Sequence, residues 1–543
     1  MGTTAGPRAT IKRFDAAMLR GVVVHYLFDL TWAGQTFRLS RSTLVVPSTA
    51  TGEDLQFEGI LEDEIEWEEA LELFSDTAES NSFPFSVVLP ANVPQLVSRG
   101  HDLAAATGEL SLWIEGTNYE DRRILIQGRL TDPEYGFEGD PITASLQSES
   151  FEDAALVPPV GQVVTLITWP TAVSSAVGFY YPFVFGDHPV NDAGNFVLSR
   201  GYLVNNDPGD ETILIAGHPV LASAVFIKPG ASTVQVSLPV SGALDALGQY
   251  VSIVGGVGVG LGALVYDPGD DFTVRWTDSG SGHPARDGGI LGGGGDLLEH
   301  MLSLATVQVD WGKVSAAKDL LNRFRFAGTI EEPVSPIDWI SANLSPLLPM
   351  SLVMGPLGVY PVVWRYWAGR NDVVERIDLS IDPSIELDGP VEYDGAISNI
   401  VNTFTLRYGV SIFSGETRSI LTLGRSEDGT PSGSLASERS ILRYGVRSDD
   451  DESTIVYDTG TAGMILDWWA RARALPSRLV HYIVGNERSW LDRGMVVSVT
   501  HPELYLEDYV GLVENVVHME SGAFRLSVRL LEQPSHTLHT GEF

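Results

Sequence analysis

Residues 292–305 read GGGGDLLEHMLSLA and lie in the stretch from Pro284 to Arg365, around which the rest of the chain is organised. We expect the glycines to lie outside regular elements, because each one costs backbone entropy to order. Asp296 is expected to cap a helix, since its side chain can accept from the free amides of the first turn. The apolar residues that follow recur at helical spacing and predict one buried stripe: Leu297, Leu298, Met301, Leu302 and Ala305.

Two further helices and a hairpin continue this central unit. A short helix is expected from Ser315 to Asn322. Another should begin after Ser335, because Ser335 can cap it and Pro336 suits the first helical position. Strand-forming residues on both sides of a Gly-Pro-Leu-Gly turn then predict a β-hairpin over 352–364. The sequence therefore predicts a small helical unit in a chain that elsewhere is typical of strands and turns.

Composition limits the possible architectures. A chain of 543 residues is too long for one core, so several domains are expected. Its 44% of hydrophobic residues suffices for large cores, and its 56 glycines and 30 prolines favour turns and a β-rich fold. The chain has no cysteine, which excludes disulfides, thiolate catalysis and cysteine-based metal sites.

The chain is strongly acidic. Its 34 Lys and Arg residues against 71 Asp and Glu residues give a net charge of −37. A broad nucleic-acid-binding surface is therefore excluded, because affinity for phosphates comes from Lys and Arg. Two interpretations stay open: the acidity serves solubility, or it provides a surface that DNA passes without binding.

The N-terminal segment is expected to be an arm or a short helix. Residues 1–20 carry basic side chains but no apolar core segment, so they do not form a secretory signal. No apolar run reaches the roughly 18 residues that span a bilayer. We therefore expect synthesis in a cytoplasm without export, and no stable membrane insertion.

Short strand-like runs separated by turns, which are typical of sandwiches and small barrels, cover most of the N-terminal part. Pro84 predicts an edge strand, because proline lacks the N–H that an inner strand needs. The stretch 53–76 holds eleven carboxylates and no Lys or Arg, and its apolar residues predict a packed element with a charged outer face. Strands are expected at 22–28, 36–39, 42–46, 83–89, 109–114, 123–130 and 143–147.

The later parts of the chain follow similar patterns. The segments 203–214 and 264–274 each predict a strand, an Asp-Pro-Gly-Asp turn and a strand, so they are expected to be hairpins of one domain. The strand 377–385 is expected next, then a polar loop over 425–440 and a charged break over 448–453. A helix should run from Thr461 to about Ala474, with strands after it at 479–484, 495–499, 509–517 and 524–531.

The predicted fold class is mainly β and multidomain, with small barrel or sandwich domains. It includes a short α-helical unit in the middle and one helix in a C-terminal α+β domain. The expected division is an arm at 1–20, a barrel-like domain at 21–158, a Gly-rich β domain at 159–286, an α+β central unit at 287–400, a second barrel-like segment with a polar loop at 401–453, a C-terminal α+β domain at 454–533 and a tail at 534–543.

Two acidic clusters are candidates for calcium, which prefers oxygen ligands. They are residues 267–271 and the run Asp449, Asp450 and Asp451. Neither has EF-hand spacing, and a Pro-Gly turn explains the first. The histidines are scattered, and His536 and His539 lie in the polar tail. No metal site is therefore predicted.

Three other motifs bear on catalysis or cofactor binding. The match to G-x-G-x-x-A at 256–263 has strand-like residues on both sides, whereas a nucleotide site needs a helix after it. Ser281 lacks the surroundings of a nucleophile elbow. The pair Trp468 and Trp469 could line a sugar groove, although Trp468 on an amphipathic helix suits a core. No catalytic residue and no cofactor is predicted.

Several phrases in the sequence resemble the tail-tip or baseplate hub proteins of long-tailed bacteriophages and of the related gene transfer agents. The central helical unit carries most of the similarity, and both terminal parts add to it. No appended lysozyme or peptidase module is evident, so cell-wall hydrolysis is not carried over. The phrases lie at 128–136, 181–186, 297–302, 309–312, 322–332, 347–350 and 493–499.

The resemblance implies a structural hub of the virion tail, assembled in the host cytoplasm. Such hubs form a ring, usually a homotrimer, in which each chain gives two related barrel-like domains to a sixfold tail tube. The implied partners are further copies of the chain, tail tube or distal tail proteins, tail fibre or spike proteins and the tape-measure protein. DNA would meet the hub only in transit, during ejection.

Two rival functions from other classes stay open at this stage. One is a tail-associated cell-wall hydrolase, for which 71 acidic residues offer carboxylate pairs by chance alone. The other is an adhesin that binds a receptor or a carbohydrate. Turnover of purified cell wall would favour the first, and binding of the isolated protein to host surfaces would favour the second.

Overall fold

The structure is a computed structural model. It describes residues 23–61, 67–69, 82–89, 92–137, 139–148, 155–186, 199–207, 212–218, 221–227, 234–236, 240–255, 272–278, 292–394, 399–409, 417, 419–425, 431–432, 435–488, 490–519 and 523–531.

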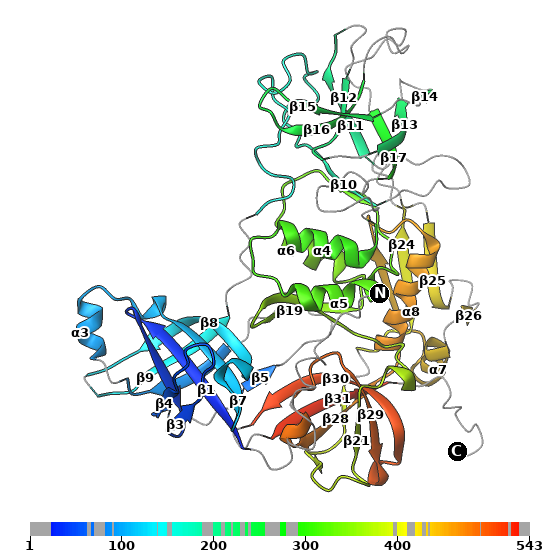
Figure 1. Cartoon of the computed structure of the whole chain (residues 1–543). Helices are drawn as coiled ribbons and strands as arrows, with labels where there is room; N and C mark the ends of the chain where they lie inside the picture. Colours follow the sequence, from blue (N-terminus) through cyan, green and yellow to red (C-terminus); the bar gives the residue numbers. More distant parts are fainter. Residues whose placement is uncertain are drawn as a thin grey trace.

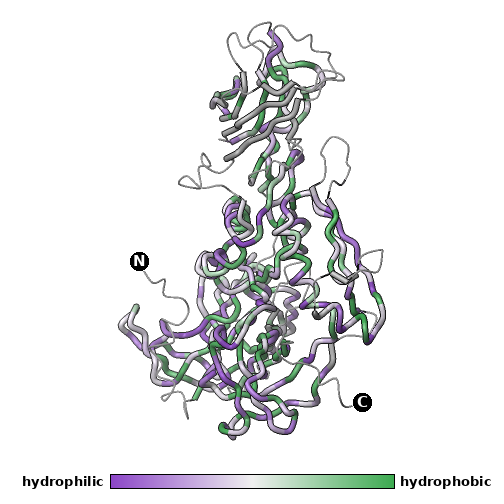
Figure 2. The backbone as a smooth tube through the Cα atoms, turned by 90° about the vertical axis from the view of Figure 1, so that its right-hand side faces the viewer, coloured by the Kyte–Doolittle hydropathy of each residue, from purple (hydrophilic) through white to green (hydrophobic). Residues whose placement is uncertain are grey.

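Two barrel-like β domains lie together at one end of the molecule (Figure 1). A small helical unit occupies the middle, and a separate β domain stands at the opposite end. Figure 2, turned by 90°, shows the same order along the long direction. The predicted fold class is confirmed: the chain is mainly β and multidomain, with a central helical unit. Among the described residues, no helix is long and apolar enough to cross a membrane.

The first barrel is an eight-stranded sheet in the order β3-β4-β2-β1-β7-β8-β9-β6. Leu61, just after β4, bridges to Val87 of β6, which brings the two ends of the sheet together. β6 ends the order and carries Pro84, as the missing N–H predicts. The elements are β1 (Val24–Trp32), β2 (Gln35–Ser40), β3 (Leu44–Val46), β4 (Leu55–Gly59), β6 (Ser82–Val87), α3 (Val93–Ser98), β7 (Thr107–Ile114), β8 (Arg123–Glu134) and β9 (Ile142–Ser148).

The second barrel brings together strands from two separate parts of the chain. Its main order is β21-β29-β30-β31-β28-β22, and β23 also pairs with β28. The strands predicted near the C-terminus are confirmed as β28 to β31. The bounds are β21 (Glu375–Asp378), β22 (Glu386–Leu387), β23 (Glu392–Asp394), β28 (Ser477–Val484), β29 (Val496–His501), β30 (Leu506–His518) and β31 (Phe524–Leu530).

Both barrels contain the same four-stranded unit. In the first, β7, β8 and β9 form a meander, and β6, which precedes them in the chain, pairs with β9. In the second, β29, β30 and β31 form a meander, and β28 pairs with β31. Every one of these pairings is antiparallel. The two units thus share order, direction and connectivity.

One short strand crosses from the first barrel to the second. β5 (Trp67–Glu69) lies in the acidic stretch between β4 and β6 of the first barrel, yet it pairs antiparallel with Val516 to His518 of β30. The buried side chains of both barrels also form one continuous apolar core. The two barrels are therefore packed as one body.

The central unit contains the three predicted helices and the hairpin. α5 begins four residues earlier than expected, because Asp310 caps it by accepting from the backbone amides of Gly312 and Lys313. Ser335 caps α6 as predicted, and the helix continues as a π-helical turn over Ile340–Leu344. The elements are α4 (Gly294–Leu304), α5 (Trp311–Leu321), α6 (Pro336–Trp339), β19 (Met350–Gly355) and β20 (Gly358–Val363).

The glycine run does not stay outside regular structure, and Asp296 is not the cap of α4. The helix begins at Gly294, with Gly293 as its cap residue. A Cβ on Gly295 would lie 2.3 Å from the backbone oxygen of Lys318 on α5. The expectation was wrong because these glycines let two helices approach closely, and the packing gained outweighs the backbone entropy lost. Asp296 lies in the first turn and pairs with Lys318.

A four-stranded sheet in the order β26-β25-β24-β27 packs against the long helix α8. α8 starts slightly before the predicted Thr461, because Asp458 caps it by accepting from the amide of Thr461. Part of the expected loop at 425–440 is helical, as α7. The expected charged break at 448–453 is largely the strand β27. The bounds are β24 (Thr403–Tyr408), β25 (Ser419–Arg425), β26 (Pro431–Ser432), α7 (Leu435–Tyr444), β27 (Ser448–Glu452) and α8 (Thr459–Arg473).

The β domain at the far end is inserted between the first barrel and the central unit. It is anchored by the pairing of β10 with β18 and by a bridge between Val157 and Val334. The predicted hairpin at 203–214 is formed by β11 and β12. The bounds are β10 (Phe183–Phe185), β11 (Ser199–Asn205), β12 (Thr212–Ala216), β13 (Leu221–Ile227), β14 (Val234–Val236), β15 (Val240–Leu244), β16 (Tyr250–Gly255), β17 (Phe272–Asp278) and β18 (Gly328–Ile330).

The turn of the central hairpin gives a test of this packing. Gly358 has a φ of +111°, and an added Cβ would lie 2.3 Å from the backbone oxygen of Gln308. We expect Gly358→Ala to lower the free energy of unfolding by about 2–5 kcal/mol, since backbone strain and overpacking act together. Denaturant unfolding followed by circular dichroism measures this change.

The matched control is Gly389→Ala. Gly389 also has a positive φ, +87°, but nothing lies within 4 Å of its added Cβ. We expect this variant to lose only the strain contribution of about 1–2 kcal/mol. Equal losses for the two variants would contradict the argument that Gly358 is needed for close approach.

Candidate functional site

Charged side chains gather where the second barrel meets the central unit. The ammonium of Lys313, on α5, donates to Asp492 Oδ2 at 2.9 Å. It also lies 3.6 Å from the ring centroid of Tyr360 on β20, which is a cation–π distance. Arg493 Nη2 donates to Tyr360 Oη at 3.1 Å. Helix α5, the hairpin and the segment before β29 are therefore held together by one polar cluster.

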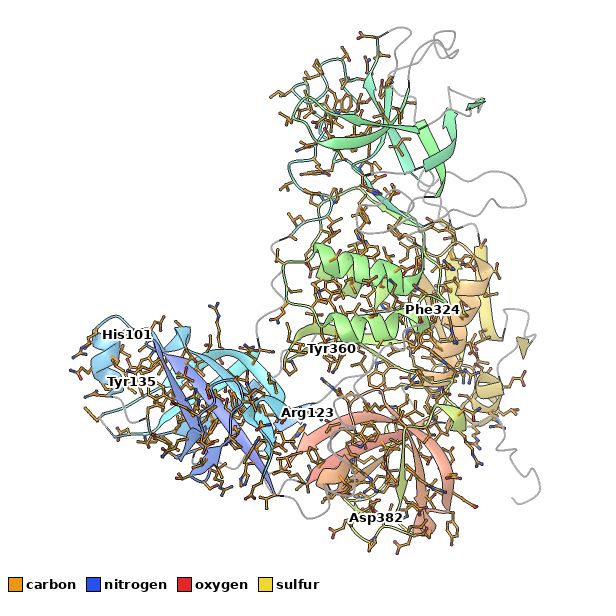
Figure 3. All side chains as sticks on the ribbon, viewed as in Figure 1. His101, Arg123, Tyr135, Phe324, Tyr360 and Asp382 are labelled. Carbon is orange, nitrogen blue, oxygen red and sulfur yellow. The ribbon has the colours of Figure 1, made fainter. Side chains whose placement is uncertain are left out.

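The first barrel contributes to the same place, which we call the junction (Tyr26, Arg123, Lys313, Tyr360, Asp492, Arg493 and His518). Figure 3 labels Arg123 and Tyr360, on facing elements of this region. Tyr26 Oη on β1 donates to the backbone oxygen of Met519, just after β30, at 2.9 Å. The charge of Arg123 at the start of β8 acts on both Asp492 and His518. The two barrels and the central unit thus meet at the junction.

Electrostatics fix the protonation states in the junction. Burial by itself would raise the pKa of Asp492, but the charges of Lys313, Arg123 and Arg493 outweigh it and hold that pKa well below its usual range. Burial lowers the pKa of His518 well below its ordinary 6.5, and Arg123 lowers it further. The carboxylate is therefore charged and the imidazole neutral at neutral pH.

These shifts determine how the junction responds to acid. The pKa of Asp492 is lower in the folded chain than in the unfolded one, so its stabilisation is lost as the pH falls through the folded value. His518 resists protonation when folded, whereas in the unfolded chain it binds a proton below about 6.5. Both groups therefore make the junction less stable in acid.

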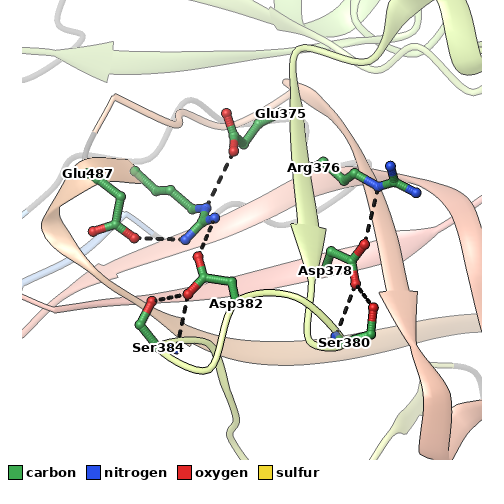
Figure 4. Close-up of polar contacts among 8 residues, drawn as sticks. Glu375, Arg376, Asp378, Ser380, Asp382, Ser384 and Glu487 are labelled. Carbon is green, nitrogen blue, oxygen red and sulfur yellow. Dashed lines mark hydrogen bonds and ion pairs between the residues drawn. The ribbon is translucent and has the colours of Figure 1, made fainter. Parts of the chain in front are cut away.

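A second polar cluster lies at the end of the second barrel (Figure 4). The buried guanidinium of Arg488 donates to Asp382 Oδ2 at 2.9 Å and to Glu487 Oε1 at 2.7 Å, and Glu375 Oε1 lies 3.5 Å from its Nε. Hydrogen bonds from Ser384 lower the pKa of Asp382 to about 2 against the effect of burial, and Arg488 lowers it further.

This cluster explains why the predicted strand 377–385 was too long. β21 ends at Asp378, whose Oδ1 accepts from the amide of Ser380 at 3.0 Å. Asp382 accepts from the amide of Ser384 in the same way, also at 3.0 Å. Two successive Asp-x-Ser turns thus replace the ladder hydrogen bonds of a strand.

The acidic run at 449–451, a calcium candidate in the sequence, lies on β27 and pairs with cations of the protein. Asp449 Oδ2 lies 2.8 Å from Arg473, and Asp450 Oδ2 lies 2.6 Å from Arg407. Among the residues that the structure describes, no three His, Asp or Glu side chains are placed to hold a metal ion.

The tryptophan pair of α8 is in the core. Trp468 and Trp469 are only 3% and 6% exposed. Their indole N–H groups donate to the backbone oxygens of Leu347 at 3.0 Å and Pro346 at 3.1 Å. They anchor α8 to the central unit and do not line a groove. The other sequence candidates, at 256–263, 267–271, Ser281, His536 and His539, lie outside the described residues.

Sequence reasoning missed the junction, although one signal points to it. The chain contains only four lysines, and two of them, Lys313 and Lys318, lie on α5. Both are ion-paired, Lys318 with Asp296 and Glu299 of α4. Concentration of so rare a residue on one short helix could have marked that helix. Lys313 and its partner Asp492, however, are 179 residues apart in the sequence.

No family model matches the sequence, and no curated protein sequence matches it significantly. Solved structures similar to the chain include tail proteins. One is a tail protein from Neisseria meningitidis, with 9% identity, 94% of this chain and 97% of that chain covered, and a TM-score of 0.37. Another is the 43 kDa tail protein of prophage MuSo2 from Shewanella oneidensis, with 9% identity, 93% and 98% covered, and a TM-score of 0.34.

A third similar structure is prophage tail protein gp18 from Listeria monocytogenes, with 8% identity, 90% of this chain and 94% of that chain covered, and a TM-score of 0.32. All three similar structures are tail proteins.

The first prediction from the junction concerns its charge balance. Asp492→Asn removes the carboxylate that faces Lys313, Arg123 and Arg493. Because Asp492 and Lys313 are half-buried, we expect the free energy of unfolding to fall by about 2–3 kcal/mol. This loss lies between the values typical of buried and exposed ion pairs. The control is Asp467→Asn, which breaks an exposed pair with Arg471 and should cost at most about 0.5 kcal/mol. Equal losses in denaturant unfolding would contradict a special role for the junction.

A second prediction concerns pH and uses Asp29 of the first barrel. Asp29 accepts from Tyr119 Oη at 3.1 Å, and burial raises its pKa from 3.8 to about 6. Its folded pKa lies above the unfolded one, so its contribution to stability falls as the pH rises through 4 to 6. We expect Asp29→Asn, compared with the natural chain, to gain up to about 3 kcal/mol in unfolding free energy between pH 4 and pH 8.

The control for Asp29 has the opposite sign. The pKa of Asp382 is lowered to about 2, so its carboxylate stabilises the fold above its unfolded value. The unfolding free energy of Asp382→Asn should therefore fall relative to that of the natural chain as the pH rises from 2 to 5. Unfolding curves at a series of pH values measure both variants. Parallel pH profiles for Asp29→Asn and the natural chain would show the first expectation to be wrong.

Proposed function

We propose that this chain is the structural hub of a phage tail tip or baseplate. Three copies would form a ring that connects the tail tube to distal fibre or spike proteins. The ring would surround the channel through which the tape-measure protein and then DNA pass. The proposal starts from the sequence phrases of the central unit and of both barrels, and the arrangement of the barrels supports it.

The observation that carries the proposal is the repeated four-stranded unit. β6 to β9 and β28 to β31 share strand order, direction and connectivity. Three copies of a chain with two such units would present six similar surfaces. This number matches a tail tube with sixfold symmetry, so one chain could join a threefold assembly to a sixfold one.

A connector of this kind must hold its two units at a fixed distance and angle. The junction supplies that rigidity through the Lys313–Asp492 pair and the bond from Tyr26 to Met519. The pairing of β5 with β30 adds a backbone tie between the barrels. Because the apolar cores of the two barrels are also continuous, any rotation between them would expose buried side chains.

The charge of the chain suits a passage for DNA. A net charge of −37 gives a surface that repels phosphates and prevents tight binding. The same charge keeps free chains soluble before assembly in the host cytoplasm. Tail tube proteins, fibre or spike proteins and the tape-measure protein are the proposed partners in the virion tail.

Electron cryomicroscopy of intact tails tests the proposal. We expect density for this chain at the tip of the tail tube, in three copies with six barrel-like units around a central channel. A position along the tube, in the capsid or in the fibres alone would contradict the hub. Turnover of purified cell wall by the isolated protein, abolished by one Asp or Glu substitution, would favour a hydrolase instead.

A further inference from the structure

The inserted β domain begins with a segment that contains no charged residue and exposes several apolar side chains. Residues 155–186 contain no Asp, Glu, Lys, Arg or His, although 19% of the whole chain is charged. Several apolar side chains in this segment are exposed, among them Val160 at 59%, Leu166 at 60% and Ile167 at 74%. Monomeric proteins rarely leave such side chains clustered in water, and a cluster marks a contact with another molecule.

A second segment extends this surface. The turn between β15 and β16 exposes Leu244 at 66% and Leu247 at 59%. Its Ala246 amide donates to the backbone oxygen of Thr168 at 3.3 Å, which places the turn beside Leu166 and Ile167. We call the exposed apolar residues of the two segments the neutral face: Leu156, Val160, Leu166, Ile167, Val177, Phe179, Leu244 and Leu247.

The one charged group of the β15–β16 turn points inward. Asp245 is 7% exposed and accepts from Tyr181 Oη at 2.6 Å. Its other oxygen accepts from the backbone amides of Leu247 at 2.8 Å and Gln249 at 2.9 Å. Trp169 Nε1 donates to the same Tyr181 hydroxyl at 3.2 Å. The charge is thus satisfied below the surface, and it holds the turn in a shape prepared for binding.

The occupant of the neutral face follows from the charge of the chain. Copies that each carry −37 repel one another over most of their surface. They can approach most closely where the facing side chains carry no charge, and the side chains of the neutral face carry none. A basic partner would find no carboxylate to pair with there, whereas an identical neutral face leaves no charge unpaired when water is excluded.

We propose that the neutral face binds the neutral faces of other copies of this chain, so that copies meet through their inserted domains. The inference rests on the proposed function only in that the hub contains several copies. The inserted domain lies at the opposite end of the molecule from the two barrels (Figures 1 and 2). The contact between copies therefore leaves the barrels open to other tail proteins.

The absence of cysteine from the sequence makes a direct test possible. Ile167→Cys in the full-length protein places one thiol on the neutral face. We expect a short bismaleimide to join its copies covalently, as seen on a denaturing gel. Ile381→Cys, on a side chain of the second barrel that is 75% exposed, is the matched control and should give modified monomers only. Modification of the Ile167→Cys thiol in an oligomeric protein without any cross-link would overturn the proposal.

The complementary test introduces charge into the neutral face. We expect the natural chain to have three times the 58.8 kDa mass of one copy by light scattering. The double variant Ile167→Asp, Leu247→Asp should fall to one third of the natural mass, and Ile381→Asp should leave it unchanged. Melting curves check that each variant is folded, which is expected because both sites are exposed. A double variant that keeps the natural mass, or a natural chain that is monomeric at all concentrations, would overturn the proposal.

The tests separate this inference from the proposed function. If the chain is found at the tail tip and the double variant keeps its mass, the hub stands and the neutral face is not the contact between copies. If the Ile167→Cys variant cross-links its copies but the chain is absent from tail tips, the contact stands and the hub falls. If the natural chain is monomeric and the double variant no longer enters tails, the neutral face binds a different protein.

Discussion

The arrangement of the two barrels and the central unit depends on the ion pair between Lys313 and Asp492. Asp492 must stay charged, because three cations surround it, and Lys313 must stay near it, because the pocket offers it an anion and an aromatic face. Helix α5 is thereby fixed against the second barrel. Tyr26 and Arg123 extend the same cluster to the first barrel. The charge balance in this cluster thus fixes the central unit and the two barrels relative to one another.

Close packing of backbone segments also stabilises the central unit. Glycines at the start of α4 allow it to lie against α5, and Gly358 allows the hairpin to approach the segment before α5. Trp468 and Trp469 then attach α8 to the central unit through their indole N–H groups. The central unit therefore acts as the core to which the barrels, the four-stranded sheet and the inserted domain are all attached.

The chain is strongly acidic overall, but the segment 155–186 of the inserted domain has no charged residue. In the proposed hub, the net charge of −37 would keep copies apart over most of their surface and let DNA pass, while the neutral face would be the place where copies meet. Asp245 shows how the fold maintains this division, since its carboxylate is turned inward to the hydroxyl of Tyr181. The proposed hub would need both properties in one chain.

The sequence by itself determined the local elements: the helix caps at Ser335 and the spacing of α4, the edge strand with Pro84, and the mainly β class. These follow from propensity, capping and periodicity, which act within about four residues. Only the tertiary structure decided that Lys313 meets Asp492, that β5 pairs with β30, and that the glycines before Asp296 enter a helix. The reason is physical: pairing of charges and strands far apart in sequence depends on burial and chain connectivity, and no local pattern records either.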